Sequence, residues 1–292
     1  MNLLEGLDKL GLGNVEHMEI YEAETEEVRH AVKKADEPEV KPVKDQEAGF
    51  LFDKSYTCPI CDNNFKTKTV RAGKAKMMGS DGDLRPRYES IDVIKYDTVV
   101  CPRCGYSALS RYFKFMSNIQ AKLIKNNICV NFRSRDYDGE IYTYDEALER
   151  YKLVLANAII KKAKNSEKAY ICLKTGWLLR GMLEHLEMDK TYVKKKLTYT
   201  KQEEEFLKFA YEGFLAARSS EPFPMCGMDE GTVDYLLSAL AVRFHDFNVA
   251  TRLVSELLSS KTVNSRTKEK TRLLKEELEK EMAAQKKAEE EK

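Results

Sequence analysis

Two short cysteine motifs, Cys58-Pro59-Ile60-Cys61 and Cys101-Pro102-Arg103-Cys104, decide how the first half of this chain is organised. Two residues between paired cysteines let both sulfur atoms turn inward from one tight bend. Two such pairs supply the four thiolates of a tetrahedral zinc site, and four sulfur ligands leave no open position for catalysis. No histidine lies between residues 50 and 115. We therefore expect one structural Zn²⁺ per chain, with the ligands Cys58, Cys61, Cys101 and Cys104.

Other uses of these four thiols stay open at this point. An iron centre takes the same ligands, and the thiols could also be free or form a dithiol redox pair. Thioredoxin-like chemistry needs a strand, a cysteine pair and a helix inside an α/β pattern, with one exposed cysteine of low pKa. That pattern is absent from the sequence, which favours the structural metal.

The segment between the two motifs predicts a small β unit with a capping helix, spanning residues 49–127. Alternating residues from Ile94 to Val100 predict a strand that leads into Cys101. After Gly105 the apolar spacing becomes helical, and this predicts a helix that covers the zinc unit and breaks at Asn126-Asn127. Five cations after the first motif are expected in a loop, which is either solvated or contacts nucleic acid: Lys66, Lys68, Arg71, Lys74 and Lys76.

The flanking segments differ sharply in composition. Residues 1–48 predict an amphipathic helix, built on Leu3, Leu4, Leu7 and Leu10, and then an acidic flexible arm. The leucine stripe either packs on its own chain or docks in a partner's groove. From Tyr144 onward the apolar spacing is helical, and residues 263–292 predict a charged C-terminal helix or tail.

Residues 128–262 are expected to form a helical domain of tetratricopeptide (TPR)-like hairpins. Leu237 and Ser238, a turn at Asp246-Phe247, and then Ala250 and Val254 occupy positions where that repeat places apolar, small and turn residues. A non-repeat helical bundle would also place small residues at helix crossings. The predicted fold is thus mainly α, with TPR-like hairpins that follow a small zinc-ribbon-like β unit.

Composition limits the classes of function. Forty-nine Lys and Arg against 48 Asp and Glu give a net charge of +1, which indicates neither a nucleic-acid nor a membrane partner. Seven cysteines, as two pairs and three singles, suit a reducing compartment better than a disulfide framework. The start of the chain lacks a cationic signal region, and no long apolar run suggests a membrane span. We expect a cytoplasmic protein.

The motifs together resemble a bacterial family catalogued as domain of unknown function 2225. The resemblance rests on the two cysteine motifs, Phe65-Lys66-Thr67-Lys68, Tyr88, Tyr96-Asp97 and Gly105-Tyr106, and it covers roughly residues 50–260. It implies a cytoplasmic bacterial protein with a zinc-binding front, a helical-repeat back and no assigned activity. It supplies no catalytic residues.

Three functions follow as hypotheses. The first is a non-enzymatic, zinc-stabilised scaffold or adaptor that binds a protein or peptide partner through its helices. The second is a nucleic-acid-associated zinc protein that uses the basic residues 66–76. The third is a thiol-redox protein or an enzyme of unfamiliar design, for which Cys226 is the thiol to test. The four histidines show no ligand spacing, and no phosphate-binding glycine loop or nucleophile elbow is present.

Overall fold

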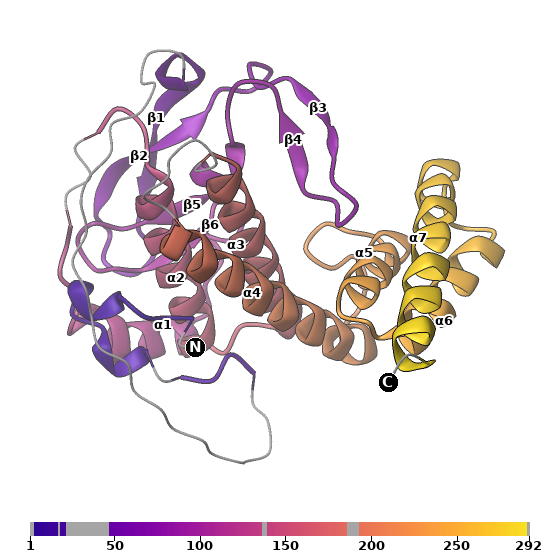
Figure 1. Ribbon diagram of the computed structural model, residues 1–292. Coiled ribbons are helices and arrows are strands. Elements are labelled where there is room, and N and C mark those ends of the chain that lie inside the picture. Colours follow the sequence, from indigo (N-terminus) through magenta and orange to yellow (C-terminus); the bar gives the residue numbers. More distant parts are fainter. Residues whose placement is uncertain (1–2, 17, 22–46, 136–138, 186–192, 291–292) are drawn as a thin grey trace.

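The computed structural model describes residues 3–16, 18–21, 47–135, 139–185 and 193–290. Within these residues the fold is mainly α, with short two-stranded antiparallel sheets near the N-terminus (Figure 1). The strands are β1 (Leu51–Thr57), β2 (Asn64–Val70), β3 (Met77–Ser80), β4 (Pro86–Tyr88), β5 (Thr98–Val100) and β6 (Ser107–Leu109). The sheets pair β1 with β2, β3 with β4 and β5 with β6. The helices α1 to α7 span Asn118–Ile124, Tyr144–Ile160, Asn165–His185, Val193–Ser220, Glu230–Arg243, Phe247–Ser259 and Ser265–Glu290.

Side-chain caps fix where several helices begin. Thr143 accepts a hydrogen bond from the Glu146 amide, and the Glu146 carboxylate accepts one from the Thr143 amide, which closes a capping box at the start of α2. Asp229 and Asp246 accept bonds from backbone amides at the starts of α5 and α6. The prediction that helices dominate from Tyr144 onward is confirmed for the described residues.

The long helices α3 and α4 pack as antiparallel neighbours, and the helices share a large apolar core. Contacts at both ends join α3 to α4, where Ser166 pairs with Glu221 and Arg180 pairs with Glu203. Helix α7 packs on both α5 and α6. The core cluster includes residues from Leu3 to Leu278, so the strands and the helices share it. Among the described residues, no helix has a stretch long and apolar enough to cross a bilayer.

The N-terminal leucines belong to this core. Leu3, Leu4, Leu7 and Leu10 are at most 5% exposed. They form turns and a short 3₁₀-helix η1, Leu7–Leu10, so the prediction of an amphipathic helix is wrong in its extent. Because the stripe packs on its own chain, its side chains are not available to a partner's groove. The acidic arm was expected over a stretch that includes residues 22–46, which lie outside the described residues.

Two predicted elements around the second cysteine motif differ from the structure. The stretch expected as one strand is a 3₁₀-helix η4, Val93–Tyr96, followed by the short β5. The reason is local, since the Asp92 carboxylate accepts a hydrogen bond from the Ile94 amide and caps a helical turn.

The capping helix expected directly after Gly105 is also wrong in its start. Residues 107–109 form β6, and α1 begins only after Ser117, which closes a capping box with Gln120. The break expected at Asn126-Asn127 is instead a π-helical turn η5, Lys125–Cys129.

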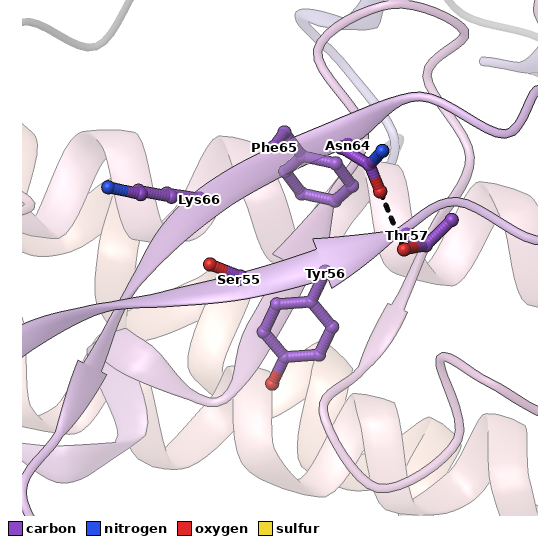
Figure 2. Close-up of a pocket in the computed structure, with 6 residues that line it drawn as sticks. All are labelled: Ser55, Tyr56, Thr57, Asn64, Phe65 and Lys66. Carbon is purple, nitrogen blue, oxygen red and sulfur yellow. Dashed lines mark hydrogen bonds between the residues drawn. The ribbon is translucent and has the colours of Figure 1, made fainter.

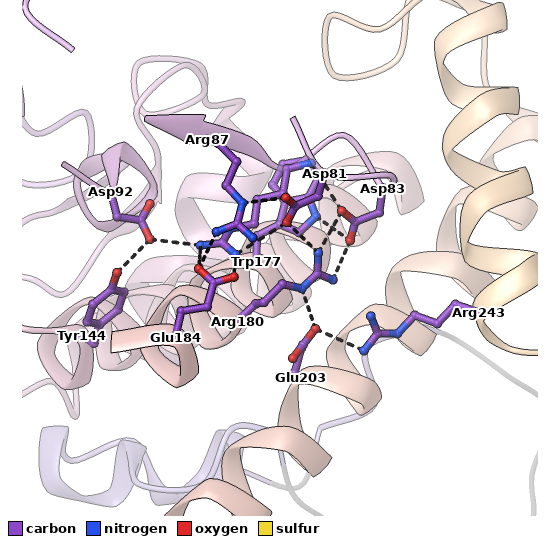
Figure 3. A network of polar contacts seen from close by, with 11 residues as sticks. Asp81, Asp83, Arg87, Asp92, Tyr144, Trp177, Arg180, Glu184, Glu203 and Arg243 are labelled. Carbon is purple, nitrogen blue, oxygen red and sulfur yellow. Dashed lines mark hydrogen bonds and ion pairs between the residues drawn. The ribbon is translucent and has the colours of Figure 1, made fainter. Parts of the chain in front are cut away.

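A polar network fastens the β3–β4 hairpin to the helices, and sequence reasoning missed it (Figure 3). Asp83 lies in the turn of this hairpin, and its carboxylate accepts hydrogen bonds from the Trp177 indole and from the Arg180 guanidinium. Burial by itself would raise the pKa of the Asp81 carboxyl, but hydrogen bonds from Arg87 and Arg180 outweigh it and lower that pKa. The hairpin is thereby held against α3 by charge-assisted hydrogen bonds.

The same hairpin also reaches the C-terminal helices (Figure 1). The Lys270 ammonium group on α7 donates a hydrogen bond to the Ser80 hydroxyl at 2.7 Å. β3–β4 therefore contacts both the α3 region and α7, and it links parts of the chain that are about 100 and 190 residues away in sequence.

Candidate metal centre

The structure brings the four predicted cysteines together. Their Sγ atoms all lie within 4.8 Å of one another. Cys58 and Cys104 are 3.6 Å apart at sulfur, and Cys61 and Cys101 are 3.7 Å apart. A tetrahedral zinc with Zn–S bonds of about 2.3 Å places its sulfur ligands about 3.8 Å apart. The cluster therefore has the spacing of a four-thiolate metal site, while disulfide bonds need sulfurs about 2 Å apart.

The two cysteine motifs have the same backbone geometry. The Asp62 amide donates to the Cys58 carbonyl at 3.0 Å, and the Gly105 amide donates to the Cys101 carbonyl at 3.0 Å. Asp62 and Gly105 both adopt left-handed backbone angles, with φ of 57° and 73°. Aspartate tolerates this region better than most residues do. Each motif is thus a tight turn that ends in a left-handed residue, and both turns present their thiols to one point.

Replacing Gly105 with alanine should disrupt the second turn. A Cβ atom at Gly105 would lie 2.4 Å from the Phe132 ring, in a backbone conformation that alanine rarely adopts. We expect a loss of about 3 kcal/mol in the free energy of unfolding, from the left-handed strain and the overpacking together. Urea unfolding of the metal-loaded protein measures it.

The matched control for this change is Gly82→Ala. A Cβ atom at Gly82 would meet nothing within 4 Å, and the backbone there is not left-handed. We expect Gly82→Ala to change the free energy of unfolding by less than about 1 kcal/mol. Equal losses for the two variants would show that the turn after Cys104 is not constrained.

The thiols influence one another's ionisation. Hydrogen bonds from Cys104 and Cys58 lower the pKa of the Cys101 thiol. A hydrogen bond with Cys101 is the main cause that raises the pKa of Cys58. Four thiolates at these spacings would repel one another strongly, so they can all ionise only around a cation. The chemistry of the donor set therefore fits a bound metal.

Helix α2 holds the second turn in place. The Asn157 side chain is fully buried and donates to the Gly105 carbonyl at 3.2 Å and to the Ser107 hydroxyl at 2.8 Å. The neighbouring Tyr106 is also fully buried, and its hydroxyl donates to the Phe113 carbonyl. The candidate metal centre is therefore built into the core on the α2 side.

All seven cysteines lie among the described residues, and each is a free thiol. Cys129 is half-buried, and its interaction with the Cys104 thiol lowers its pKa. No spacing signal points to it, because it follows Cys104 by 25 residues and comes from the π-helical turn. Burial raises the pKa of Cys226, and its thiol donates to the Ser166 carbonyl. These features do not favour a reactive Cys226.

Three of the five basic residues, Arg71, Lys74 and Lys76, lie in the predicted loop, and two do not. Lys66 and Lys68 lie on strand β2, and the others follow it. Lys68 lies 3.8 Å from the Asp53 carboxylate, and Lys76 lies 3.2 Å from Glu89. These two carboxylates compensate part of the positive charge locally.

Lys66 borders an open hollow of about 390 Å³ on β1–β2. Figure 2 shows the residues that line it: Ser55, Tyr56, Thr57, Asn64, Phe65 and Lys66.

A comparison with protein-family models matches residues 51–278 to a family described as uncharacterized protein conserved in bacteria (DUF2225). The chain belongs to this family. The match to DUF2225 includes both cysteine motifs and continues into α7. No curated protein and no solved structure matches the chain. The resemblance noted in the sequence is thereby confirmed, and the family description itself assigns no activity.

Proposed function

We propose that this member of the DUF2225 family is a zinc-stabilised scaffold, which binds a protein or peptide partner through its helices and has no catalytic role. The observation that carries the proposal is the cluster of four cysteine thiols with sulfur spacings of 3.6 and 3.7 Å. Four sulfur ligands saturate the ion, so its role is structural. The metal would hold the two turns together and, through Asn157, fix their position on α2.

The helical half supports a role as a platform. In the α5–α6 hairpin, Leu237, Ser238, Ala250 and Val254 are all at most 3% exposed. Small and apolar residues thus meet at this crossing, as they do in helical-repeat proteins, whose stacked hairpins present extended surfaces to partners. On the neighbouring α7, the apolar side chain of Leu273 is 61% exposed.

One experiment separates this proposal from the nucleic-acid alternative. The full chain is used as bait in host lysate, and the metal content, the bound protein and the absorbance of nucleic acid are measured on the same sample. We expect one zinc per chain and a discrete protein partner that protects amides in α3–α7 from hydrogen exchange. The double variant Lys66→Glu, Arg71→Glu should retain that partner, because both residues lie outside the helical half.

Three outcomes would contradict the proposal. Recovery of nucleic acid that is lost in the Lys66→Glu, Arg71→Glu variant would favour the alternative, since charge reversal weakens phosphate contacts. Iron in place of zinc would assign the cluster to an iron centre of the same ligand type. If the partner protected amides from hydrogen exchange only in β1 and β2, the helices would not be its binding surface.

A further inference from the structure

One short segment around α1 carries the most exposed apolar side chains of the described residues. Phe115, Ile119 and Val130 are 72%, 74% and 68% exposed, and no other large apolar side chain that the structure describes exceeds 61%. Phe115 lies just before α1, Ile119 lies on it, and Val130 follows the π-helical turn η5. Single exposed apolar residues are ordinary on a protein surface, but three in one segment mark a candidate binding surface.

The segment has an inner and an outer side. Ile124 and Ile128 are fully buried, so they mark the side that packs on the core. Ile119 lies about 140° around the helix from Ile124, and it shares a side with Lys122, which is one turn further along. The outer side of α1 therefore presents apolar and basic side chains to solvent.

The charge of this part of the chain has one sign, although the whole chain carries only +1. Residues 98–135 contain no aspartate or glutamate, and their cations, all exposed, are Arg103, Arg111, Lys114, Lys122, Lys125, Arg133 and Arg135. Of these cations, only Arg135 forms an ion pair with another described residue, Glu149. The charges of Lys114, Lys122 and Lys125 are therefore not compensated by a carboxylate of the described chain.

Contacts within the fold hold this surface in place. Ser117 and Gln120 close a capping box at the start of α1. After η5, the Phe132 ring lies against Gly105 of the second cysteine motif, so closely that a Cβ atom there would be 2.4 Å from the ring. The segment is thus fixed against the candidate metal centre, and its outer side is a preformed surface.

We propose that the outer side of residues 114–130, the α1 face, docks on an anionic lipid surface. The three exposed apolar side chains enter the headgroup region, and the three lysines lie beside lipid phosphates. Helices that lie in a membrane interface combine these two features, an apolar stripe and flanking cations. An acidic peptide would pair with the lysines but would leave the apolar side chains in water, because they project from the convex side of a helix and not into a groove.

Co-sedimentation of the metal-loaded full chain with lipid vesicles tests this docking. One set of vesicles contains phosphatidylglycerol and phosphatidylcholine in equal parts, and the other contains phosphatidylcholine alone. We expect saturable binding to the anionic vesicles and binding at least about tenfold weaker to the neutral ones, because each cation near an anionic surface adds to the affinity. High salt should weaken the binding, because it screens the lysines.

Two variants with matched controls locate the surface. Ile119→Ser should weaken binding about tenfold, because it removes a large apolar group from the interface. Its control is Leu273→Ser, since Leu273 is also an exposed leucine-sized side chain but lies on α7. Lys122→Gln should weaken binding about fivefold, and Lys74→Gln, which removes an exposed cation outside the segment, should not. All four side chains are exposed, so these replacements leave the fold intact.

Three results would overturn the proposal. The first is equal binding, or no binding, to the anionic and the neutral vesicles. The second is equal binding by Ile119→Ser and Leu273→Ser. The third is binding to soluble polyglutamate without binding to vesicles, which would assign the α1 face to an acidic peptide. The inference does not rest on the scaffold role, because α1 lies outside α3–α7, and recovery of the protein partner by Ile119→Ser reports separately on that role.

Discussion

Replacing Cys101 with serine is expected to abolish metal binding and to cause the largest loss of stability among the changes considered. Three thiolates and a hydroxyl bind zinc far more weakly than four thiolates do. A structural zinc site contributes on the order of 10 kcal/mol to folding, which is comparable with the whole stability of a domain. We therefore expect the front of the chain to be unfolded at 25 °C. Elemental analysis and circular dichroism melts of the purified variant measure both effects.

The structure also indicates how far this unfolding should spread. Judged from sequence alone, loss of the metal would unfold the front half and leave the helices largely intact. Helix α2, however, contacts the metal unit directly, since Tyr151 donates to the Ile94 carbonyl and Asn157 donates to the Gly105 carbonyl. We expect hydrogen exchange in Cys101→Ser to show lost protection in α2 and retained protection in α5 and α6.

Cys226→Ser is the matched control for this prediction. Cys226 is half-buried and free, and it lies in the turn before α5, outside the thiol cluster. This variant should bind one zinc per chain and lose no more than about 2 kcal/mol, from its hydrogen bond with Ser166 and its packing. A Cys101→Ser protein with full zinc and an unchanged melt would show that the four thiols are not a metal site.

The thiol cluster could be predicted because its geometry is local. Each pair of cysteines lies within one turn, and the spacing alone forces both sulfurs to the same side. A left-handed residue completes each turn, Gly105 in one motif and Asp62 in the other. The spacing within each pair does not show that the two turns meet. Four thiols in a core, however, have few stable arrangements other than a shared metal site.

The segment between Asp92 and Cys129 could not be predicted as well, because several elements there are short and buried. Strands β5 and β6 have three residues each, and all six residues are buried. A strand that is covered on both sides loses the alternation of apolar and polar residues that marks a strand in sequence. The helical spacing after Gly105 was therefore a coincidence of apolar residues that serve a strand, a turn and a later helix.

The polar network around Arg180 could not be predicted from the sequence, for a different reason. Its guanidinium bonds with Asp83 across 97 residues and with Glu203 across 23. A chain with 33% charged residues offers many such pairs, and nothing local distinguishes those that meet in the fold.

Replacing Arg180 with methionine should be the second most damaging change. Arg180 donates to Asp81, Asp83 and Glu203 at 2.7 to 3.1 Å, and the Asp83 and Glu203 side chains are only 9% and 7% exposed. Methionine fills a similar volume but leaves these carboxylates without a shared cation. Removing one partner from a buried charge network costs about 3–5 kcal/mol. We expect that loss in urea unfolding, together with faster hydrogen exchange in β3 and β4.

A double variant tests whether the loss comes from the orphaned carboxylate or from lost packing. Arg180→Met with Asp83→Leu removes the Arg180–Asp83 contact from both sides, and replacing both partners by apolar groups is often close to neutral. We expect the double variant to regain about half of the lost stability, although Trp177 then loses its acceptor. Additive losses would mean that Asp83 and Arg180 act independently, and the network would then not be what holds the hairpin on α3.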